Sequence, residues 1–480
     1  MSGSATMPLW HGADVIAALQ SVLTATPSVD WMANGLSIDT RDIKPRDIFV
    51  ALPGEKADGH DFVIRAFESG AAAALVRPDF ASQDVPRNGV LLPVPDVLQA
   101  LELLGRAARA RSTAHITAIT GSVGKTGVKS ALAAALGKTG AVHASEKSFN
   151  NHIGVPLSLA RLPQQADYAV FELGMNHAGE IAALVDMVRP HVALITTVGA
   201  AHIEHFDSEA DIARAKAEIF AGLVDDGVAI IPRDNQHYPL LAEAAAGFAQ
   251  IDFSLSDATA KVHAVQTHLH PTCSCVTAHI GAQEVTFKVG TAGEHHVANS
   301  LAVLAAVQQA GGDLALAALS LADNQGLSGR GMRHQLQLSD GVLTLIDESY
   351  NANPSSMRAA LTTLGLTPRL GRGRRIAVLG DMAELGEAAA ALHADLAETV
   401  ERADIDLVVT CGPLMQHLHE HLPPGRMGPH FKTKEDVVAL LARDLRADDV
   451  VMVKGSNASG MGQVVSALLA GRETTEKRAG

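Results

Sequence analysis

The stretch Thr120-Gly121-Ser122-Val123-Gly124-Lys125-Thr126 decides the fold of the middle of this chain. An alternating apolar run at residues 115–119 precedes it and predicts a strand, and an Ala/Leu-rich run at residues 130–136 predicts a helix after it. A strand, a Gly-rich turn and a helix that opens with Lys-Thr form the usual binding site for nucleotide phosphates. The glycines let backbone N–H groups approach the anion, and the helix N-terminus adds partial positive charge. We therefore predict that Lys125 neutralises the β- and γ-phosphates and that the Thr126 hydroxyl binds magnesium.

The loop is shorter than the general phosphate-binding pattern. That pattern has a glycine five residues before Gly124, where this chain has Ile119. A Gly-rich turn without a ligand is the alternative interpretation.

Composition limits the classes of function. With 480 residues the chain should hold about three domains of ~150 residues each. The net charge of −14 argues against a nucleic-acid or membrane-surface partner. Three cysteines exclude a disulfide framework, and they lack metal-finger spacing. Residues 1–10 lack the pattern of a signal peptide, and no apolar run is long enough to span a membrane. We expect a cytoplasmic monomer.

Three α/β segments are predicted along the chain, with boundaries at 1–111, 112–326 and 327–480. The first has predicted strands at 47–52 and 71–76 and helices at 61–69 and 96–109. In the second, period-2 runs at 275–280 and 284–289 predict antiparallel strands, and a helix is expected over 293–309. The third has a strand at 342–348 and three β–α repeats with strands at 375–379, 406–410 and 449–453. These repeats predict a doubly wound, Rossmann-like domain without a GxGxxG fingerprint.

Two polar side chains follow strands in the second segment. Glu172 ends the run 168–172, and His202 follows the run 192–198. Because ligands of parallel sheets bind beyond the carboxyl ends of the strands, Lys125, Glu172 and His202 should converge on one crevice. A carboxylate and an imidazole suit divalent ions beside phosphates. The alternatives are a helix-capping acid and a solvated loop histidine.

Several stretches together resemble the Mur ligase family. The resemblance covers nearly the whole chain, and its most specific parts are Phe149-Asn150-Asn151 and Ser349-Tyr350-Asn351-Ala352-Asn353-Pro354. Further matching stretches are 37–41, 47–52, 58–60, 120–126, 152–156, 172–175, 215–220, 347–348 and 379–386.

The resemblance implies a three-domain α/β enzyme of peptidoglycan precursor synthesis. Its expected parts are a small UDP-binding N-domain, a central P-loop domain whose parallel sheet has an antiparallel addition, and a C-terminal Rossmann-like domain that binds the incoming amine. The family member it resembles most joins D-alanyl-D-alanine to UDP-N-acetylmuramoyl-tripeptide. ATP activates the substrate carboxylate as an acyl phosphate, and the amine then attacks.

The resemblance also implies roles for residues. Two magnesium ions would be held by Thr126, Glu172, His202 and Lys216, the last as a carbamate; an ordinary solvated lysine is the alternative for Lys216. The expected catalytic residues are Lys125, Glu172, His202, Lys216, Asn299 and Arg330. ATP would contact Gly121, Ser122, Val123, Gly124, Lys125, Thr126, Gly127, Asn299, Arg330, Glu348, Tyr350 and Asn351. The UDP-linked substrate would contact Asp39, Thr40, Arg41, Asn150 and Asn151.

Three positions depart from the family pattern. His296 replaces a usual Asn, Asn457 a usual Arg, and Gly462 a usual acid. The alternatives are the family's ligase that adds the third amino acid, folate polyglutamyl synthetases and a non-ligase P-loop ATPase. The first often carries Asp-Asn-Pro where this chain has Cys411-Gly412-Pro413. Folate polyglutamyl synthetases lack an N-terminal UDP-binding domain of this type, and a non-ligase P-loop ATPase would not need the third domain or the run Phe149-Asn150-Asn151.

Overall fold

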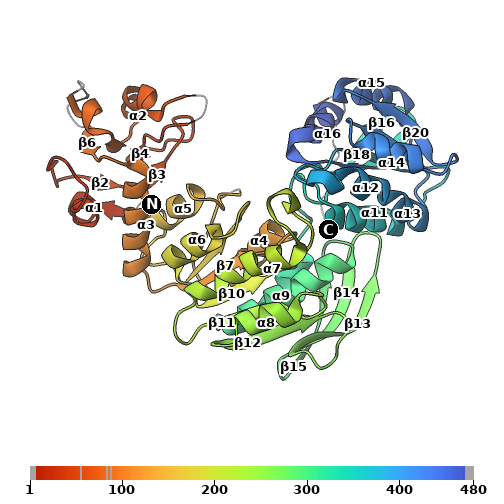
Figure 1. Ribbon diagram of the computed structural model, residues 1–480, viewed down its shortest axis with the longest axis horizontal. Helices are drawn as coiled ribbons and strands as arrows, with labels where there is room; N and C mark the ends of the chain where they lie inside the picture. Colours follow the sequence, from red (N-terminus) through yellow and green to blue (C-terminus); the bar gives the residue numbers. More distant parts are fainter. Residues whose placement is uncertain (1–6, 55–56, 83–84, 87–88, 147, 471–480) are drawn as a thin grey trace, which may run out of the picture.

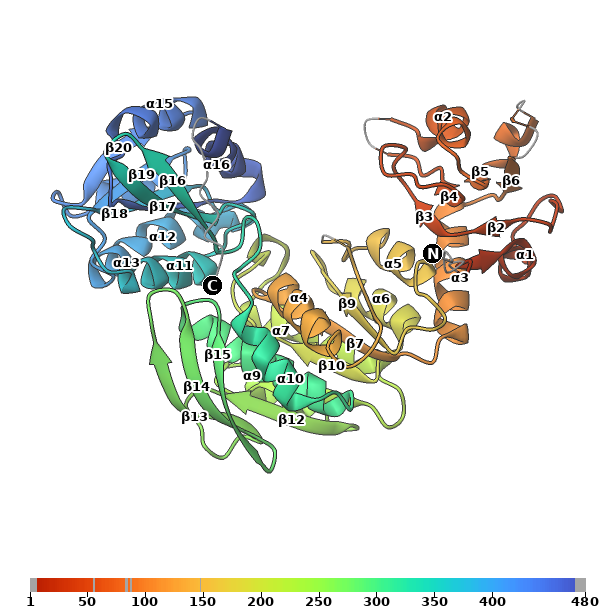
Figure 2. The same ribbon diagram turned by 180° about the vertical axis from the view of Figure 1, so that it is seen from behind.

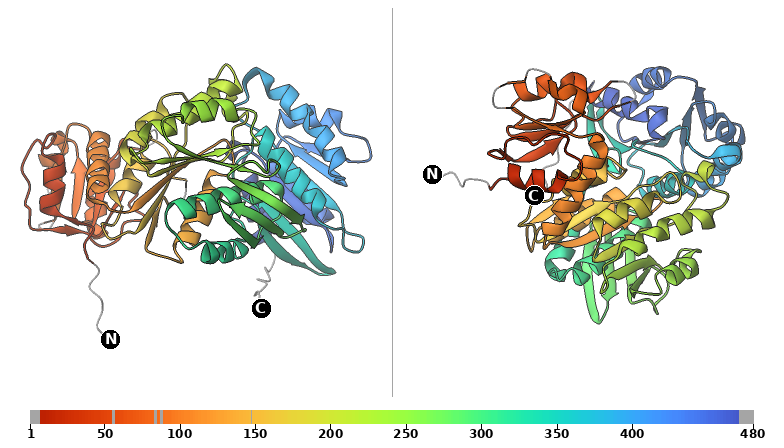
Figure 3. Two further views of the ribbon diagram at one scale, coloured as in Figure 1. Left: turned by 90° about the horizontal axis from the view of Figure 1, so that it is seen from below. Right: turned by 60° about the vertical axis from the view of Figure 1, so that its left-hand side comes forward.

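The structure is a computed structural model, and it describes residues 7–470 apart from 55–56, 83–84, 87–88 and 147. Three α/β units follow one another along the chain, each built on its own main sheet. The N-terminal and C-terminal units lie at opposite ends of the central one (Figure 1), as the view from behind also shows (Figure 2). Seen from below, the three units form a row along the long axis (Figure 3). The predicted three-domain α/β class is confirmed, while the boundaries at residues 111 and 326 stay predictions.

The N-terminal domain is a parallel sheet in the order β3-β4-β5-β6 beside a two-stranded ribbon, β1-β2. The predicted strand at 47–52 ends at Val50. Its elements are β1 (Trp10–His11), α1 (Gly12–Leu19), β2 (Met32–Ala33), β3 (Gly35–Ser37), β4 (Asp47–Val50), η1 (Gly59–Phe62), α2 (Val63–Glu68), β5 (Ala73–Val76), η2 (Pro78–Ser82), β6 (Val90–Pro93) and α3 (Val97–Arg111).

The central domain is a nine-stranded sheet in the order β15-β14-β13-β12-β11-β10-β7-β9-β8. Its elements are β7 (His115–Thr120), α4 (Lys125–Leu136), β8 (Val142–Ala144), α5 (Gly154–Ala160), β9 (Tyr168–Glu172), α6 (Glu180–Val188), β10 (Val192–Ile195), η3 (Ile203–His205), α7 (Glu209–Ala217), η4 (Glu218–Gly222), β11 (Val228–Pro232), α8 (Tyr238–Ala244), β12 (Ala249–Ser254), β13 (Val262–Leu269), β14 (Ser274–Ile280), β15 (Gln283–Val289), α9 (Glu294–Gln309) and α10 (Leu314–Ala322).

Helices cover both faces of this sheet, so its inner strands are buried on both sides and read as continuous apolar runs. One core forms against α5, α6 and α7, and the other against α4, α9 and α10. The strands β13, β14 and β15 pair antiparallel, as their period-2 pattern predicts. Buried and partly exposed residues alternate along β14 because only one of its faces packs on the core.

The C-terminal domain is a six-stranded sheet in the order β16-β17-β21-β18-β19-β20. Separate cores on its two faces confirm the doubly wound prediction. Its elements are β16 (Met332–Leu338), β17 (Gly341–Glu348), α11 (Pro354–Leu366), β18 (Arg375–Gly380), η5 (Gly386–Ala388), α12 (Ala389–Ala394), α13 (Leu396–Arg402), β19 (Leu407–Cys411), α14 (Met415–His421), β20 (Met427–Phe431), α15 (Lys434–Asp444), β21 (Val450–Lys454), η6 (Asn457–Ser459) and α16 (Met461–Ala470).

The sequence did not predict the two edge strands of this sheet, β16 and β20. Both are edge strands with mostly partly exposed or exposed residues, so they lack the buried apolar run that marks an inner strand. Within the residues that the structure describes, no helix is long and apolar enough to cross a membrane.

Candidate active site

The Gly-rich loop lies between the end of β7 and the start of α4, as predicted. Gly121 has φ +149° and Gly124 has φ +91°. A Cβ at Gly121 would lie 1.9 Å from Thr196 Oγ1, and one at Gly124 would lie 3.0 Å from the Asn299 amide. Both positions therefore require glycine for backbone conformation and for space.

The segment after β10 holds the loop in place. The Ser122 hydroxyl donates to the Gly199 carbonyl at 2.9 Å, and the Gly199 N–H donates to the Ser122 oxygen at 3.0 Å. The Thr196 hydroxyl donates to the Val123 carbonyl at 2.5 Å. These three hydrogen bonds hold the loop against the segment after β10. A Cβ added at Gly127, in the first turn of α4, would meet open space.

Lys125 folds back over the loop. Its Nζ donates to the Gly121 carbonyl at 2.6 Å. Burial lowers the pKa of Lys125, and the nearby Glu172 carboxylate and Arg330 guanidinium act on it in opposite directions. The lysine is therefore positioned beside the loop backbone, and its hydrogen-bond acceptor among the described residues is a neutral carbonyl.

The Glu172 carboxylate lies at the end of β9 and is 1% exposed. Thr126 donates its hydroxyl to one carboxylate oxygen at 2.8 Å, and the Asn150 amide donates to the other at 2.8 Å. The Lys129 ammonium lies 3.9 Å away, and it also donates to the Ser145 carbonyl at 2.8 Å. The buried Thr126 and Glu172 and the partly buried Asn150 thus form one hydrogen-bonded group beside the loop.

His202 and Lys216 complete this side of the crevice. The pKa of His202 is lowered by burial first and further by the positive charges of Lys125 and Lys216, against the opposite effect of Glu384. Lys216 on α7 is 2% exposed, and burial beside Lys125 lowers its pKa well below the ordinary value. Within the described part of the chain its ammonium group makes no hydrogen bond or ion pair. Glu172 acts on the pKa of Lys125, and Lys125 acts on the pKa of His202. The structure therefore brings Lys125, Glu172 and His202 together in one crevice.

Asn299 and Arg330 approach the loop from other elements. The Asn299 amide on α9 lies against Gly124, and the Arg330 guanidinium stacks 4.1 Å from the centre of the Tyr350 ring. The side chain of Asn353, at the start of α11, donates to the Ser122 carbonyl at 3.5 Å. The C-terminal domain therefore reaches the phosphate loop directly.

Glu348 and Asn351 are held by a buried lysine of the C-terminal domain. The Lys454 ammonium lies 3.3 Å from the Glu348 carboxylate and donates to the Asn351 carbonyl at 3.0 Å. The His295 and His296 rings lie 4.1 Å apart at the start of α9, and burial lowers the pKa of each. The charges of Glu348 and Lys454 also act on His295, so this pair of rings faces the C-terminal domain.

The remaining predicted residues lie elsewhere or do other work. Asp39, Thr40 and Arg41 follow β3 in the N-terminal domain, where the exposed Arg41 guanidinium pairs with Asp39 at 2.5 Å. The Asn151 side chain accepts hydrogen bonds from the backbone amides of Ile153 and Gly154 at 3.2 and 2.9 Å. It therefore stabilises the start of α5, a role that its place in the motif did not indicate.

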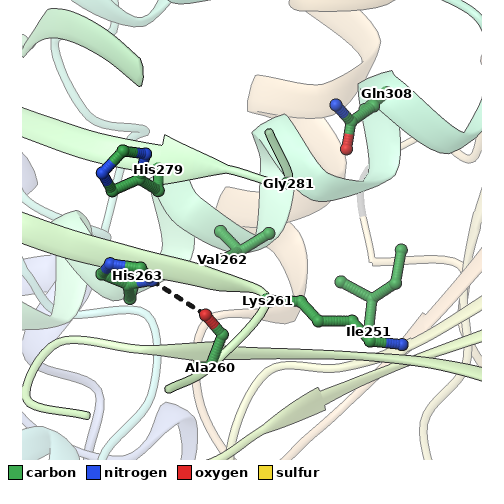
Figure 4. A pocket seen from close by; sticks show the side chains of 8 residues that line it. All are labelled: Ile251, Ala260, Lys261, Val262, His263, His279, Gly281 and Gln308. Carbon is green, nitrogen blue, oxygen red and sulfur yellow. Dashed lines mark hydrogen bonds between the residues drawn. The ribbon is translucent and has the colours of Figure 1, made fainter. Parts of the chain in front are cut away.

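Two cavities have linings that include no residue of the phosphate loop. One of about 470 Å³ lies between the edge of β12, the strands β13 and β14, and α9; Figure 4 shows its side chains, among them Lys261, His263, His279 and Gln308. The other, of about 400 Å³, lies in the C-terminal domain, and both Asn457 and Gly462 line it. Two of the three positions that depart from the family pattern thus line the same cavity.

Family models match three successive parts of the chain. "Mur ligase family, catalytic domain" matches residues 33–111, "Mur ligase middle domain" residues 119–307, and "Mur ligase, glutamate ligase domain" residues 332–457. The chain belongs to the Mur ligase family.

Individual relatives of this Mur ligase match along almost its whole length. UDP-N-acetylmuramoyl-tripeptide–D-alanyl-D-alanine ligase of Escherichia coli is 37% identical over 92% of this chain and 94% of the relative. The ligase of the same name from Bacillus subtilis is 34% identical over 91% of this chain and 93% of the relative. A crystal structure of MurF from Acinetobacter baumannii superposes with a TM-score of 0.82 at 28% identity, covering 97% of this chain and all of that one.

The family implies magnesium, and the residues of this Mur ligase fit one ion. The Thr126 hydroxyl and the Glu172 carboxylate present oxygen ligands 2.8 Å apart, which is the donor type that magnesium prefers. Among the described residues no group of three or more His, Cys, Asp or Glu could hold a metal without help. Phosphate oxygens and water would have to supply the other ligands, as is usual for magnesium at nucleotide sites.

Sequence reasoning missed three residues of this crevice in the Mur ligase. Lys129 lies four residues after Lys125 on α4, so the helical i, i+4 spacing could have indicated it. Asn353 and Glu384 belong to motifs that carried the resemblance, but no local pattern says that they reach the central domain.

Proposed function

We propose that this Mur ligase joins D-alanyl-D-alanine to UDP-N-acetylmuramoyl-tripeptide, with conversion of ATP to ADP and phosphate. The observation that supports this proposal most is the hydrogen-bonded group of Thr126, Asn150 and Glu172 beside the phosphate loop. Full-length similarity to relatives with this activity supports the choice of substrates.

The reaction requires a carboxylate and a triphosphate, both negative, to approach each other. The tripeptide carboxylate attacks the γ-phosphate, ADP leaves, and the amine of D-alanyl-D-alanine attacks the resulting acyl phosphate to give amide and phosphate. Phosphoryl transfer depends mainly on positioning and on neutralising negative charge. Lys125, Lys129 and Arg330 would supply positive charge around the loop. The Arg330 guanidinium lowers the pKa of both lysines, although burial is the larger cause for each, which supports a position of Arg330 close to the two.

The Lys125 ammonium would change its hydrogen-bond acceptor when ATP binds. A phosphate oxygen is a charged acceptor and forms a stronger hydrogen bond than a neutral carbonyl does. We propose that the Lys125 ammonium leaves the Gly121 carbonyl for the γ-phosphate when ATP binds. The loop N–H groups and the start of α4 would hold the other phosphates.

Magnesium, held by Thr126 and Glu172 at one position and by His202 and Lys216 at a second, would supply further positive charge at the phosphates. Lys216 fits a carbamate. Burial lowers the pKa of Lys216 well below its ordinary value, which favours the neutral amine, the form that adds carbon dioxide with loss of one proton. The resulting anion would offset the charge of Lys125.

The other two domains would bind the remaining substrates. Asp39, Thr40 and Arg41 lie beyond the carboxyl end of β3, the usual side for ligands of a parallel sheet, and would bind the UDP moiety. Asn150 would contact the sugar-peptide arm. Glu348, Tyr350 and Asn351 would contact the nucleotide from the C-terminal side. We also propose that the enzyme acts in the cytoplasm, as a monomer.

Substrate dependence tests the function. With ATP and magnesium, phosphate release should require both UDP-N-acetylmuramoyl-tripeptide and D-alanyl-D-alanine. Phosphate release when neither of the two is present would indicate a simple ATPase. Phosphate release with the UDP-N-acetylmuramoyl-dipeptide plus a diamino acid would indicate the ligase of the preceding step. For Lys216, rescue of Lys216→Ala by a small carboxylate would support the carbamate, whereas full unaided activity would contradict it.

A further inference from the structure

A side-chain to side-chain hydrogen bond joins the central domain to the C-terminal domain close to Lys125 of the phosphate loop. It links Nδ1 of His202, after β10, to a carboxylate oxygen of Glu384, after β18. The two residues are 182 positions apart in the chain. Their pairing therefore depends entirely on how the two domains dock.

The backbone on both sides is shaped for this contact. His202 has φ +61° and Glu384 has φ +60°, a left-handed conformation that costs free energy for residues other than glycine. The Glu204 N–H donates to the Glu384 carbonyl at 3.3 Å. Ile203 packs against the cores of both domains. His202 and Glu384, which lie just before the short helices η3 and η5, thus meet on a small docked surface.

The contact fixes which imidazole nitrogen carries the proton. An ionised carboxylate only accepts hydrogen bonds, so Nδ1 must donate and a neutral ring keeps its free lone pair on Nε2. The charged groups that act on this ring are Glu384, Lys125 and Lys216. Histidines that bind metals almost always donate their other N–H to a carboxylate or carbonyl, which fixes ring orientation and tautomer.

We propose that Glu384 is a positioning residue: the C-terminal domain supplies the carboxylate that sets His202 of the central domain for metal binding. The inference rests on the proposed role of His202 as a ligand of the second magnesium ion. Its consequence is that this metal site is complete only while the C-terminal domain is docked. Domain docking and metal affinity are then coupled through one hydrogen bond.

The first test uses the enzyme without ligands. In ¹⁵N NMR spectra the His202 ring, assigned by its loss in His202→Gln, should carry its proton on Nδ1. Glu384→Ala should remove that preference, and Glu384→Gln should keep part of it because the amide oxygen still accepts. Glu387→Ala, at an exposed acid of η5, is the matched control and should leave the signal unchanged. An unchanged His202 signal in Glu384→Ala would overturn the proposal.

The second test measures metal affinity. Mn²⁺ binding is followed by electron paramagnetic resonance with a nonhydrolysable ATP analogue present. Loss of a group that orients a metal ligand typically weakens binding about 10- to 100-fold, so Glu384→Ala should show a loss in this range, and Glu384→Gln a smaller one. Affinity within about twofold of wild type in Glu384→Ala would contradict the inference, because that range would not be reached.

The two tests separate this inference from the proposed function. A wild-type enzyme without ligase activity on the proposed substrates, but with the expected His202 signal and Mn²⁺ loss, would refute the function and leave the role of Glu384. An active ligase whose Glu384→Ala variant keeps both readouts would refute the role of Glu384 alone.

Discussion

The central domain meets its two neighbours through different chemistry. Toward the N-terminal domain, α3 packs on α5, and Leu157 and Ala160 of α5 belong to the same apolar core as the N-terminal strands. The buried Trp10 indole donates to the Ala160 carbonyl at 2.9 Å, and Arg111 stacks 3.6 Å from the centre of the Trp10 ring. This junction is continuous with a domain core.

Toward the C-terminal domain the contacts are mostly polar. They include the His202–Glu384 hydrogen bond, the Asn353 amide on Ser122 and the backbone contact between Glu204 and Glu384. Polar contacts exchange with water at little net cost, whereas separating an apolar core exposes surface at about 25 cal/mol per Å². The N-terminal junction should therefore persist through the catalytic cycle, and the C-terminal junction should open and close. Such closure is common where a site is shared between domains.

Trp10→Ala should have the largest effect on stability. Truncation of a buried aromatic side chain costs about 3–5 kcal/mol. Urea unfolding should show one shifted transition for the N-terminal and central domains together, because they share a core. Leu319→Ala, at a side chain 69% exposed, is the control and should change stability by less than about 0.5 kcal/mol. A loss below about 1 kcal/mol for Trp10→Ala would show that the junction is not a true core.

Lys125→Ala should have the largest effect on activity while leaving the fold intact. Loss of one positive group at developing charge costs about 10²–10³ in kcat, measured as acyl-phosphate formation and phosphate release. Its thermal unfolding should match that of the wild type, in contrast to Trp10→Ala. Lys138→Ala, at an exposed lysine just after α4, should behave as wild type. Near-normal turnover in Lys125→Ala would refute its role.

Asn353→Ala tests how little the polar junction contributes to stability. Asn353 caps α11 in a capping box, so its loss costs about 1 kcal/mol by that role alone. Thr433→Ala removes a comparable cap at α15, on a helix of the same domain. In urea titrations the two variants should lose the same free energy of unfolding within about 0.5 kcal/mol, the usual margin for independent sites. A clearly larger loss in Asn353→Ala would mean that the contact to Ser122 stabilises the docked state strongly.

The smallest expected effect is a pH dependence in the N-terminal domain. Hydrogen bonds from the His60 backbone and side chain, with help from Arg77, lower the pKa of Asp58 to about 2. A carboxyl with a lowered folded-state pKa stabilises the protein above its unfolded pKa of about 4, and this stabilisation is lost as pH falls toward 2. The urea concentration at the midpoint of unfolding should therefore decrease when the pH is lowered from 5 to 3.

The shift of the urea midpoint should be smaller in Asp58→Asn. Asp61→Asn, at an exposed acid of the short helix η1 that Asp58 caps, should keep the wild-type dependence. Because the N-terminal and central domains share a core, fluorescence and circular dichroism should report one transition at both pH values. Two separate transitions would show that the N-terminal and central domains do not unfold as one unit with a shared core.

Features built from neighbouring residues could be predicted. The phosphate loop could be predicted because Gly121 and Gly124 allow positive φ angles and a helix begins directly after them at Lys125. All of these residues are close neighbours in the sequence. The strands β14 and β15 follow from period-2 alternation. Glu172 could be placed at the crevice because it ends a buried strand next to β7 in a parallel sheet.

Features that depend on residues far apart in the chain could not be predicted from the sequence. Nothing near Glu384 in the chain indicates His202, and nothing near Trp10 indicates Ala160, 150 residues away. Asn151 and Asn150 are adjacent in one motif, yet one caps a helix and the other binds the Glu172 carboxylate. Periodicity and turn chemistry record the conformation of a few neighbouring residues, whereas these partners are chosen by how whole domains pack, which leaves no repeat in the sequence.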